Sequence, residues 1–428
     1  MKKPISKEEL SKRIELNFKR LADSPYYQIG EVFAPQQYDW PADKEGRALL
    51  SFVSHYKISG KKIPCMEQMI EKLPSMLNEK GYLGAVRGEV IAEQQLSGHS
   101  WLLRGLCEYY EQFADKSVLG IIKKITENLF ICTKGRYAKY PTDRTKKDEG
   151  GVSGNEIGYC DNWLLSSDVG CAFMSIDGLS HVYKITKDKA VKELLDEMID
   201  VYLSIDKIEL RVQTHCTLTA ARGMMRMYSV TSDKKYEDCA KAIYDLYVNG
   251  GGMTYTYQNL NWWRRPDTWT EPCAIVDSLM LALELYKSTG QEDYRKTAAR
   301  IYHNGFATLQ RDNGGAGTDT LVTDGSPWDY LKARTYEAEF CCTMRLAEGL
   351  WYINENKELL YAETVGKVTK NANGIYCDGD IIYSRPDESL LPYAEETVSI
   401  DGMVLSPIVK LYRVPKDIIE SAEQKIIF

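Results

Sequence analysis

A helical hairpin recurs along this chain and limits the folds open to it. In each copy an apolar helical stretch ends near a tyrosine, a short polar turn follows, and an amphipathic helix begins. Repeated hairpins of this kind predict an architecture of stacked helix pairs. The amphipathic helices of four copies are expected at residues 118–130, 190–203, 236–247 and 294–307. The tyrosines that end the last three apolar helices are Tyr183, Tyr228 and Tyr286.

The two helices of a hairpin differ in polarity, and this difference favours one architecture. An open solenoid and a closed toroid both accommodate the hairpins. The apolar helices, such as 274–285, have almost no polar face, whereas the others carry Lys and Glu along one side. That contrast is typical of an inner and an outer helical layer. We therefore predict a mainly α fold, an (α/α)6 barrel or helical toroid, over residues 1–358.

The sequence changes character near Leu359. Residues 374–383 predict two short strands around an Asp378-Gly379 turn. The stretch 398–414 is richer in β-branched residues. Residues 359–428 are therefore predicted to form a short β-rich C-terminal appendage.

Charge and composition narrow the possible partners. The 428 residues carry a formal charge of −7, which argues against a nucleic-acid partner. No apolar run is long enough to span a bilayer, so no membrane partner is expected. The N-terminus has no apolar segment after its lysines, so we predict no signal peptide and a cytoplasmic location. The 11 cysteines are scattered and odd in number, unlike a secreted disulfide framework. The oligomeric state stays open.

One carboxylate and three cysteines lie in two short segments, each at the start of a predicted helix. Glu271 and Cys273 flank Pro272, and Cys341 and Cys342 are adjacent. Thiolates with a carboxylate form a plausible zinc set, and a thiolate at a helix N-terminus is a plausible nucleophile. The alternative is that these cysteines are ordinary core residues and that Glu271 only caps its helix.

Several short motifs follow one another in a fixed order. They are Gly250-Gly251-Gly252, then Glu271-x-Cys273, then Cys341-Cys342, with Gly98-His99 opening a helix further upstream. In this order the chain resembles the β-L-arabinofuranosidase family of glycoside hydrolases, once known as a domain of unknown function. The resemblance implies that the segment 34–40 occupies the place of that family's N-terminal substrate loop. The resemblance extends over roughly residues 30–385.

The resemblance implies a specific chemistry. Members of that family have an (α/α)6 barrel and hold one zinc ion through the Glu, the Cys two residues later and the paired cysteines. The first paired cysteine attacks the anomeric carbon. Carried over to this chain, Glu271, Cys273, Cys341 and Cys342 would be the metal ligands. Cys341, with Glu271 beside it, would be catalytic.

The chain departs from the family pattern in three places. Residues 250–265 contain no carboxylate, although the family's acid/base Glu lies just after the glycine-rich turn. Thr343-Met344 replace the prolines that normally follow the cysteine pair. The chain is also too short for the family's usual β-sandwich domains. Asp267 is the nearest carboxylate to the position of the absent acid.

Further residues are candidates for contact with a sugar. The long loops 140–163, 249–270 and 310–337 are rich in Gly and aromatic residues, and long loops often carry function. We expect the substrate-binding set to include His99, Gln37, Trp163 and Asp161. Each has a structural alternative, since His99 could be a packing residue and Asp161 could cap a helix beginning at residue 164. Other loop carboxylates considered for the acid are Glu156, Asp168 and Glu337.

Together these features predict a zinc-dependent retaining glycosidase that acts on a furanoside or a related sugar linkage, with a carbohydrate as its partner. One alternative is a catalytically inactive barrel that binds an oligosaccharide or serves as a scaffold, with a structural zinc. Another is a metal-free helical-toroid enzyme that hydrolyses uronides through carboxylates. The sugar, the linkage and the acid/base group are not specified by the sequence.

Overall fold

The computed structural model describes most of the chain up to residue 361 and four short strands beyond it. The described residues are 4–35, 39–144, 154–254, 257–265, 268, 270–318, 336–361, 368–371, 374–377, 398–400 and 403–405. They divide into two compact units, Leu21–Leu246 and Met1–Arg20 with Tyr247–Phe428. The predicted boundary between residues 358 and 359 stays a prediction. No helix in the described part is long and apolar enough to cross a membrane.

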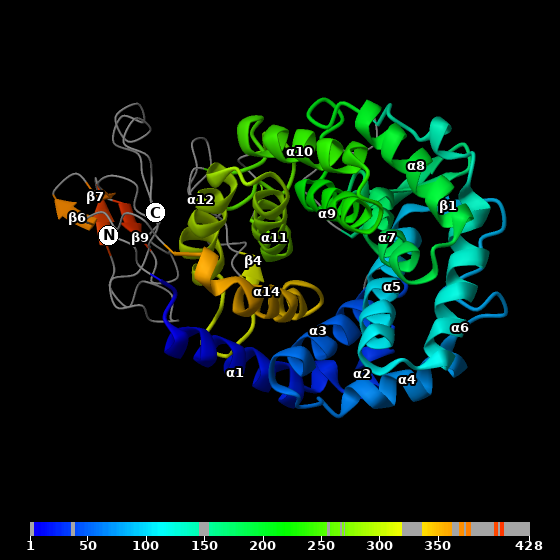
Figure 1. The fold of residues 1–428 in the computed structure, drawn as a ribbon, viewed down its shortest axis with the longest axis horizontal. Coiled ribbons are helices and arrows are strands. Elements are labelled where there is room, and N and C mark those ends of the chain that lie inside the picture. The colour runs from blue at the N-terminus through cyan, green and yellow to red at the C-terminus, as the bar shows by residue number, and fades with distance from the viewer. Residues whose placement is uncertain are drawn as a thin grey trace. The chain divides into compact units, whose positions relative to one another are not determined.

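The unit Leu21–Leu246 is built on a row of buried helices. The helices of this row pack in chain order, each against the next, and they are α3 (Asp43–Ser59), α5 (Glu93–Phe113), α7 (Ser175–Thr186) and α9 (Thr214–Thr231) (Figure 1). Amphipathic helices pack on the first three of them, namely α4 (Cys65–Met76), α6 (Lys116–Ile125) and α8 (Lys189–Ser204). The inner and outer layers predicted from polarity are therefore present in this unit.

The unit that contains Tyr247–Phe428 repeats the same arrangement. Its nearly all-buried helix α11 packs against an amphipathic neighbour, α12, and against the buried helix α14 (Figure 1). The bounds are α11 (Pro272–Thr289), α12 (Glu292–Arg300) and α14 (Cys342–Asn356). The N-terminal helix α1 (Lys7–Asp23) lies mostly in this unit, and α10 (Lys234–Asn249) connects the two units along the chain.

The tyrosines that mark the repeat have a backbone role. The residue four positions after each tyrosine ends the inner helix in a left-handed conformation, and its N–H donates to the tyrosine carbonyl oxygen. This happens at Lys187, Ser232 and Gly290, with φ of 55°, 59° and 70°. After Lys187 and Ser232 the next residue is an Asp whose carboxylate accepts from the N–H two residues on. The turn is therefore a left-handed C-cap followed directly by an Asp N-cap.

Short strands join the helices of each unit. In one unit a three-stranded sheet has the order β1 (Ile91–Ala92), β3 (Trp163–Ser166), β2 (Glu156–Cys160), with β3 parallel to β1 and antiparallel to β2. The prediction of a helix that begins at residue 164 is therefore wrong, because residues 163–166 form β3. A short, fully buried apolar run does not distinguish a strand from a helix, and here pairing on both sides selects the strand.

The β-rich tail is confirmed in part. The strands in the described residues form two antiparallel pairs, β6 (Val368–Asn371) with β7 (Gly374–Cys377) and β8 (Val398–Ile400) with β9 (Met403–Leu405). The predicted strand at Gly374 is present, but its partner precedes it in sequence. The connection between β6 and β7 is only two residues long, a favoured hairpin length. The Asp378-Gly379 turn lies outside the described residues.

The closeness of inner helices yields a first prediction. A Cβ at Gly46 on α3 would lie 2.1 Å from the backbone nitrogen of Leu102 on α5, whereas a Cβ at exposed Gly120 on α6 meets nothing within 4 Å. Gly46→Ala should lower the free energy of unfolding by about 2 kcal/mol or more, because the helices must separate. Gly120→Ala should raise it by about 0.5 kcal/mol. Denaturant titration checks both, and equal stability of the two variants would contradict the close approach.

Candidate metal centre

The first half of the centre is the N-terminus of α11. Glu271 is the N-cap, with extended φ and ψ of −117° and 115°, because a following proline disfavours helical geometry. Pro272 occupies the first helical position, where its missing N–H costs no hydrogen bond. The N–H of Glu271 donates to Oδ1 of buried Asn259 at 2.8 Å. The Glu271 carboxylate makes no capping bond to the helix.

The second half is the N-terminus of α14. Cys341 is the N-cap, with φ of −147° and ψ of −62°, and Cys342 is the first helical residue. Adjacent side chains on a regular helix point about 100° apart. Because Cys341 lies outside the helical region, the two thiols can approach each other, and their Sγ atoms are 3.3 Å apart. The carbonyl of Cys341 accepts the N–H of Arg345 at 3.1 Å, which begins the helix.

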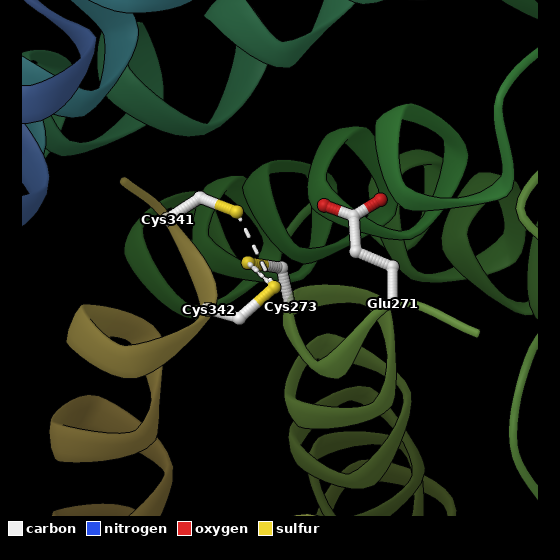
Figure 2. A group of neighbouring side chains, drawn as sticks. All are labelled: Glu271, Cys273, Cys341 and Cys342. Carbon is white, nitrogen blue, oxygen red and sulfur yellow. Dashed lines mark hydrogen bonds between the residues drawn. The ribbon is translucent and has the colours of Figure 1, made fainter. Parts of the chain in front are cut away.

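The two helix ends bring the four predicted ligands together (Figure 2). Their ligand atoms, three Sγ and one carboxylate oxygen, all lie within 4.8 Å of one another. Cys273 Sγ lies 3.7 Å from Cys342 Sγ. A tetrahedral ion with bonds of about 2.3 Å to sulfur would separate two sulfurs by about 3.8 Å. The spacing of Cys273 and Cys342 and the donor chemistry therefore fit a metal ion, whereas Cys341 and Cys342, with sulfurs 3.3 Å apart, lie closer than bound ligands would.

Burial distinguishes the members of the cluster. Cys273 and Cys342 are fully buried, whereas Cys341 and Glu271 each keep 8% of their surface exposed. Among the three cysteines of the cluster, Cys341 is the least buried. Burial raises the pKa of both Cys341 and Cys342 well above the ordinary thiol value, and the neighbouring Cys273 thiol reinforces the effect. A bound cation acts in the opposite direction, because it stabilises thiolates.

A hydrogen-bonded frame holds the segment before the cysteine pair. Arg20 on α1 donates from Nε and Nη2 to the two carboxylate oxygens of Glu337, at 2.9 and 3.1 Å, and also bonds Glu339. Glu337 also accepts from Asn313 and from the hydroxyl of Thr343. Glu337 is thus a structural carboxylate, with partners on several segments. Glu337 lies in the short strand β5 (Tyr336–Glu337), whereas the sequence suggested a loop carboxylate and gave no sign of these partners.

Thr343 has a defined role in this frame. Its hydroxyl accepts the N–H of Ala316 at 3.0 Å and donates to Glu337 at 3.1 Å. Its carbonyl accepts the side-chain amide of Asn17 on α1 at 3.1 Å. The residue that departs from the family's proline therefore ties the cysteine pair to two other segments. A proline would lack this hydroxyl.

His99 is fully buried on α5, in the other compact unit. Its Nδ1 lies 2.7 Å from the carbonyl oxygen of Gln95, and its Nε2 accepts the N–H of Leu83 at 3.0 Å. These partners fix a neutral ring with the proton on Nδ1. Burial lowers the pKa of His99 to about 4. A sugar hydroxyl would have to replace one of these bonds, so the predicted sugar contact stays a prediction.

The other predicted sugar contacts occupy different environments. Trp163 lies in β3 with only 2% of its surface exposed, and it packs edge-on against Tyr137 and Tyr140. Asp161 is exposed in the turn between β2 and β3, with φ of 49°. Both belong to the unit Leu21–Leu246, and their contact with a sugar stays a prediction. Gln37 lies outside the described residues.

The remaining candidate acids are already hydrogen-bonded or outside the described part. Glu156 shares Arg87 with Asp39, and partial burial raises the pKa of Glu156. Asp168 is buried and accepts the N–H of Gly154 and the side-chain amide of Gln213. Asp267 lies outside the described residues.

The neutral state of His99 gives a prediction for pH dependence. Its folded pKa of about 4 lies below the ordinary 6.5, so below pH 6.5 the unfolded chain gains a proton that the folded chain does not. Stability is therefore lost as pH falls from 6.5 toward 4. When the pH is lowered from 7.5 to 5, the free energy of unfolding of the wild type should fall by about 2 kcal/mol more than that of His99→Gln. Denaturant unfolding at both pH values measures the difference, and equal losses would contradict the assignment.

Comparison with known proteins supports the fold. No family model matches the chain, and no curated protein matches it. The structure of a GH127 β-L-arabinofuranosidase from Geobacillus stearothermophilus T6 is similar, with a TM-score of 0.57 and 13% sequence identity. The alignment covers 94% of this chain and 69% of that protein. The structure of an unsaturated glucuronyl hydrolase specific for heparin is also similar, with a TM-score of 0.54 and 11% sequence identity. That alignment covers 82% of this chain and 98% of the hydrolase.

A further structure, described as a glycoside hydrolase, matches 87% of this chain at 11% identity and a TM-score of 0.52. The chain spans 61% of that protein's length. The matched structures also include sugar epimerases. These likenesses show the fold, and the predicted (α/α)6-barrel class is confirmed. The family that the motifs resemble is among the structural neighbours.

Proposed function

We propose that this protein is a retaining glycoside hydrolase that cleaves a furanoside or a related sugar linkage. The observation that carries the proposal is the convergence of Glu271, Cys273, Cys341 and Cys342 at two adjoining helix ends. The same fold in glycosidases and sugar epimerases favours a carbohydrate as the substrate. The order of the motifs, shared with β-L-arabinofuranosidases, favours a furanose ring.

In this proposal the four side chains hold one zinc ion. Three sulfur ligands and one carboxylate oxygen suit zinc, and sulfur-rich sets disfavour magnesium and calcium. The contact of 3.7 Å between Cys273 and Cys342 supports a tetrahedral arrangement. When bound, zinc would supply positive charge that keeps the sulfurs ionised at neutral pH.

Cys341 is the proposed nucleophile, since it is the least buried of the three thiols in the cluster. Its sulfur forms a bond to the anomeric carbon while the bond from that carbon to the leaving oxygen breaks. The leaving oxygen takes up a proton. Water then attacks the same carbon and gives up a proton to the solvent, and the electron pair of the carbon–sulfur bond returns to Cys341 as the thiolate. Two inversions at one carbon release the sugar with its original anomeric configuration. Glu271 and Cys273 hold the site in place on α11 during both steps.

The source of the proton determines which substrates react fastest. Residues 250–265 contain no carboxylate to supply it. A leaving group that is stable as an anion needs little assistance from an acid. We therefore propose that aryl furanosides react much faster than alkyl furanosides. His99, Gln37, Trp163 and Asp161 are the proposed substrate contacts, and the cytoplasmic location stays a prediction.

A second candidate function follows from the lack of a carboxylate in residues 250–265. If no group supplies the proton, the barrel could bind an oligosaccharide or act as a scaffold, with zinc in a structural role. This candidate predicts zinc and sugar binding without turnover. Hydrolysis that is insensitive to chelators and to cysteine substitution would instead favour the metal-free uronide hydrolase.

The metal content is the first testable prediction. Protein purified under reducing conditions, without a metal-affinity tag, should contain one zinc per chain by atomic emission. Cys273→Ala should lose it, because removing one of four ligands weakens binding severely. Cys107→Ala is the control, since Cys107 is equally buried but lies on α5 in the other unit. Folded wild-type protein without zinc would overturn the metal assignment.

The nucleophile gives a separate prediction. Cys341→Ala should reduce turnover of 4-nitrophenyl β-L-arabinofuranoside by at least about 1,000-fold, because a covalent step is lost. Cys107→Ala should retain full activity. Mass spectrometry of the wild type mixed briefly with substrate should find one pentose attached to Cys341. Unchanged turnover by Cys341→Ala would eliminate this mechanism.

A further inference from the structure

The helices that carry the four cluster residues also share a buried ion pair. Asp277 lies four residues after Cys273 on α11, and Arg345 lies three residues after Cys342 on α14. Residues spaced by three or four lie on one face of a helix. The pair therefore lies one helical turn from the cluster, on the faces that carry the sulfurs.

This ion pair links the two helices directly. Arg345 Nη2 donates to Asp277 Oδ1, and Arg345 Nη1 contacts the Glu348 carboxylate on the same helix. Asp277, Arg345 and Glu348 are all at most 2% exposed in their side chains. Nearby, a Cβ at Gly349 on α14 would lie 3.0 Å from Val276 on α11. The helices are therefore in close contact at the level of this pair.

A gain in stability does not by itself explain why an ion pair is buried between α11 and α14. Removing two charges from water costs several kcal/mol, and well-packed apolar residues often replace a buried ion pair without loss of stability. What an ion pair adds is a defined position, because a planar guanidinium accepts only certain orientations of its partners. An ion pair between two helices therefore restrains how far one can slide or rotate against the other.

The cluster depends on that relative position. Glu271 and Cys273 belong to α11, whereas Cys341 and Cys342 belong to α14. Metal ligands must be held within about 0.5 Å of their productive positions. A small slide of one helix along the other would separate the cluster into two halves of two ligands each.

We infer that Asp277 and Arg345 are positioning residues for the metal centre, which they assemble by fixing the register of α11 and α14. This inference rests on the proposed zinc centre. It assigns a role to two side chains outside the proposed set of metal ligands. Their role is to reduce the rearrangement that metal binding would otherwise require.

The test compares Arg345→Lys, Arg345→Met and Asp277→Asn with the wild type. Lys keeps the charge but loses the fork that reaches both carboxylates, and Asn keeps the shape of Asp277 without its charge. The matched control is Arg226→Met, which breaks a similar pair with buried Asp177 in the other unit. Zinc affinity is measured on folded protein by competition with a chromophoric chelator. The sulfur-to-cobalt absorption of the cobalt-loaded protein reports ligand geometry.

Each of the three variants should bind zinc about 10- to 100-fold more weakly and show altered cobalt absorption, as is typical for groups that orient metal ligands. Arg226→Met should lose stability but keep wild-type zinc affinity. Wild-type affinity and spectrum in Arg345→Lys and Asp277→Asn would overturn the inference. If Arg345→Met does not fold, those two milder variants decide the matter. A wild-type protein that binds no zinc would overturn the proposed metal centre itself.

Discussion

Helices α11 and α14 are buried around most of their circumference, so the charged side chains on their buried faces, Asp277, Arg345 and Glu348, need partners inside the protein. This constraint determines much of the unit that contains them. The guanidinium of Arg345 contacts two carboxylates. At the start of α11 Asn259 accepts the N–H of Glu271, and at the start of α14 Asn17 donates to the carbonyl of Thr343. The three thiols and Glu271 gather where the two helix N-termini meet. Helix N-termini favour negative charge, which suits a cluster of potential anions.

The helical framework could be predicted from the sequence because its signal is local. An apolar stretch, a polar turn and an amphipathic stretch indicate a hairpin without knowledge of distant residues. Predictions from local sequence failed where the pairing of strands determines the secondary structure. The run from Trp163 to Ser166 is a strand because β1 and β2 lie beside it, and β7 pairs with the strand before it.

The four cluster residues could be proposed from the sequence only because their order matched a known pattern. Glu-x-Cys and Cys-Cys are weak motifs, and nothing local indicates that residues 69 positions apart will meet. The frame around them gave no signal at all. Arg20 lies more than 300 positions from its partner Glu337, and the pairing of Asp277 with Arg345 requires that two helices be adjacent. Such contacts depend on the fold and not on any local spacing.

The left-handed turn that ends an inner helix has a consequence for how this architecture can diversify. On α11 the tight turn at Gly290 and the chemically active Glu271 and Cys273 lie at opposite ends of one helix. A two-residue connection leaves no room for insertions, so sequence change there is confined to substitutions compatible with a positive φ. The segments that lead into the N-termini of α11 and α14 are instead held by side-chain hydrogen bonds, such as those of Asn259 and Arg20. Backbone conformation therefore restricts sequence change at one end of an inner helix, and side-chain partners restrict it at the other.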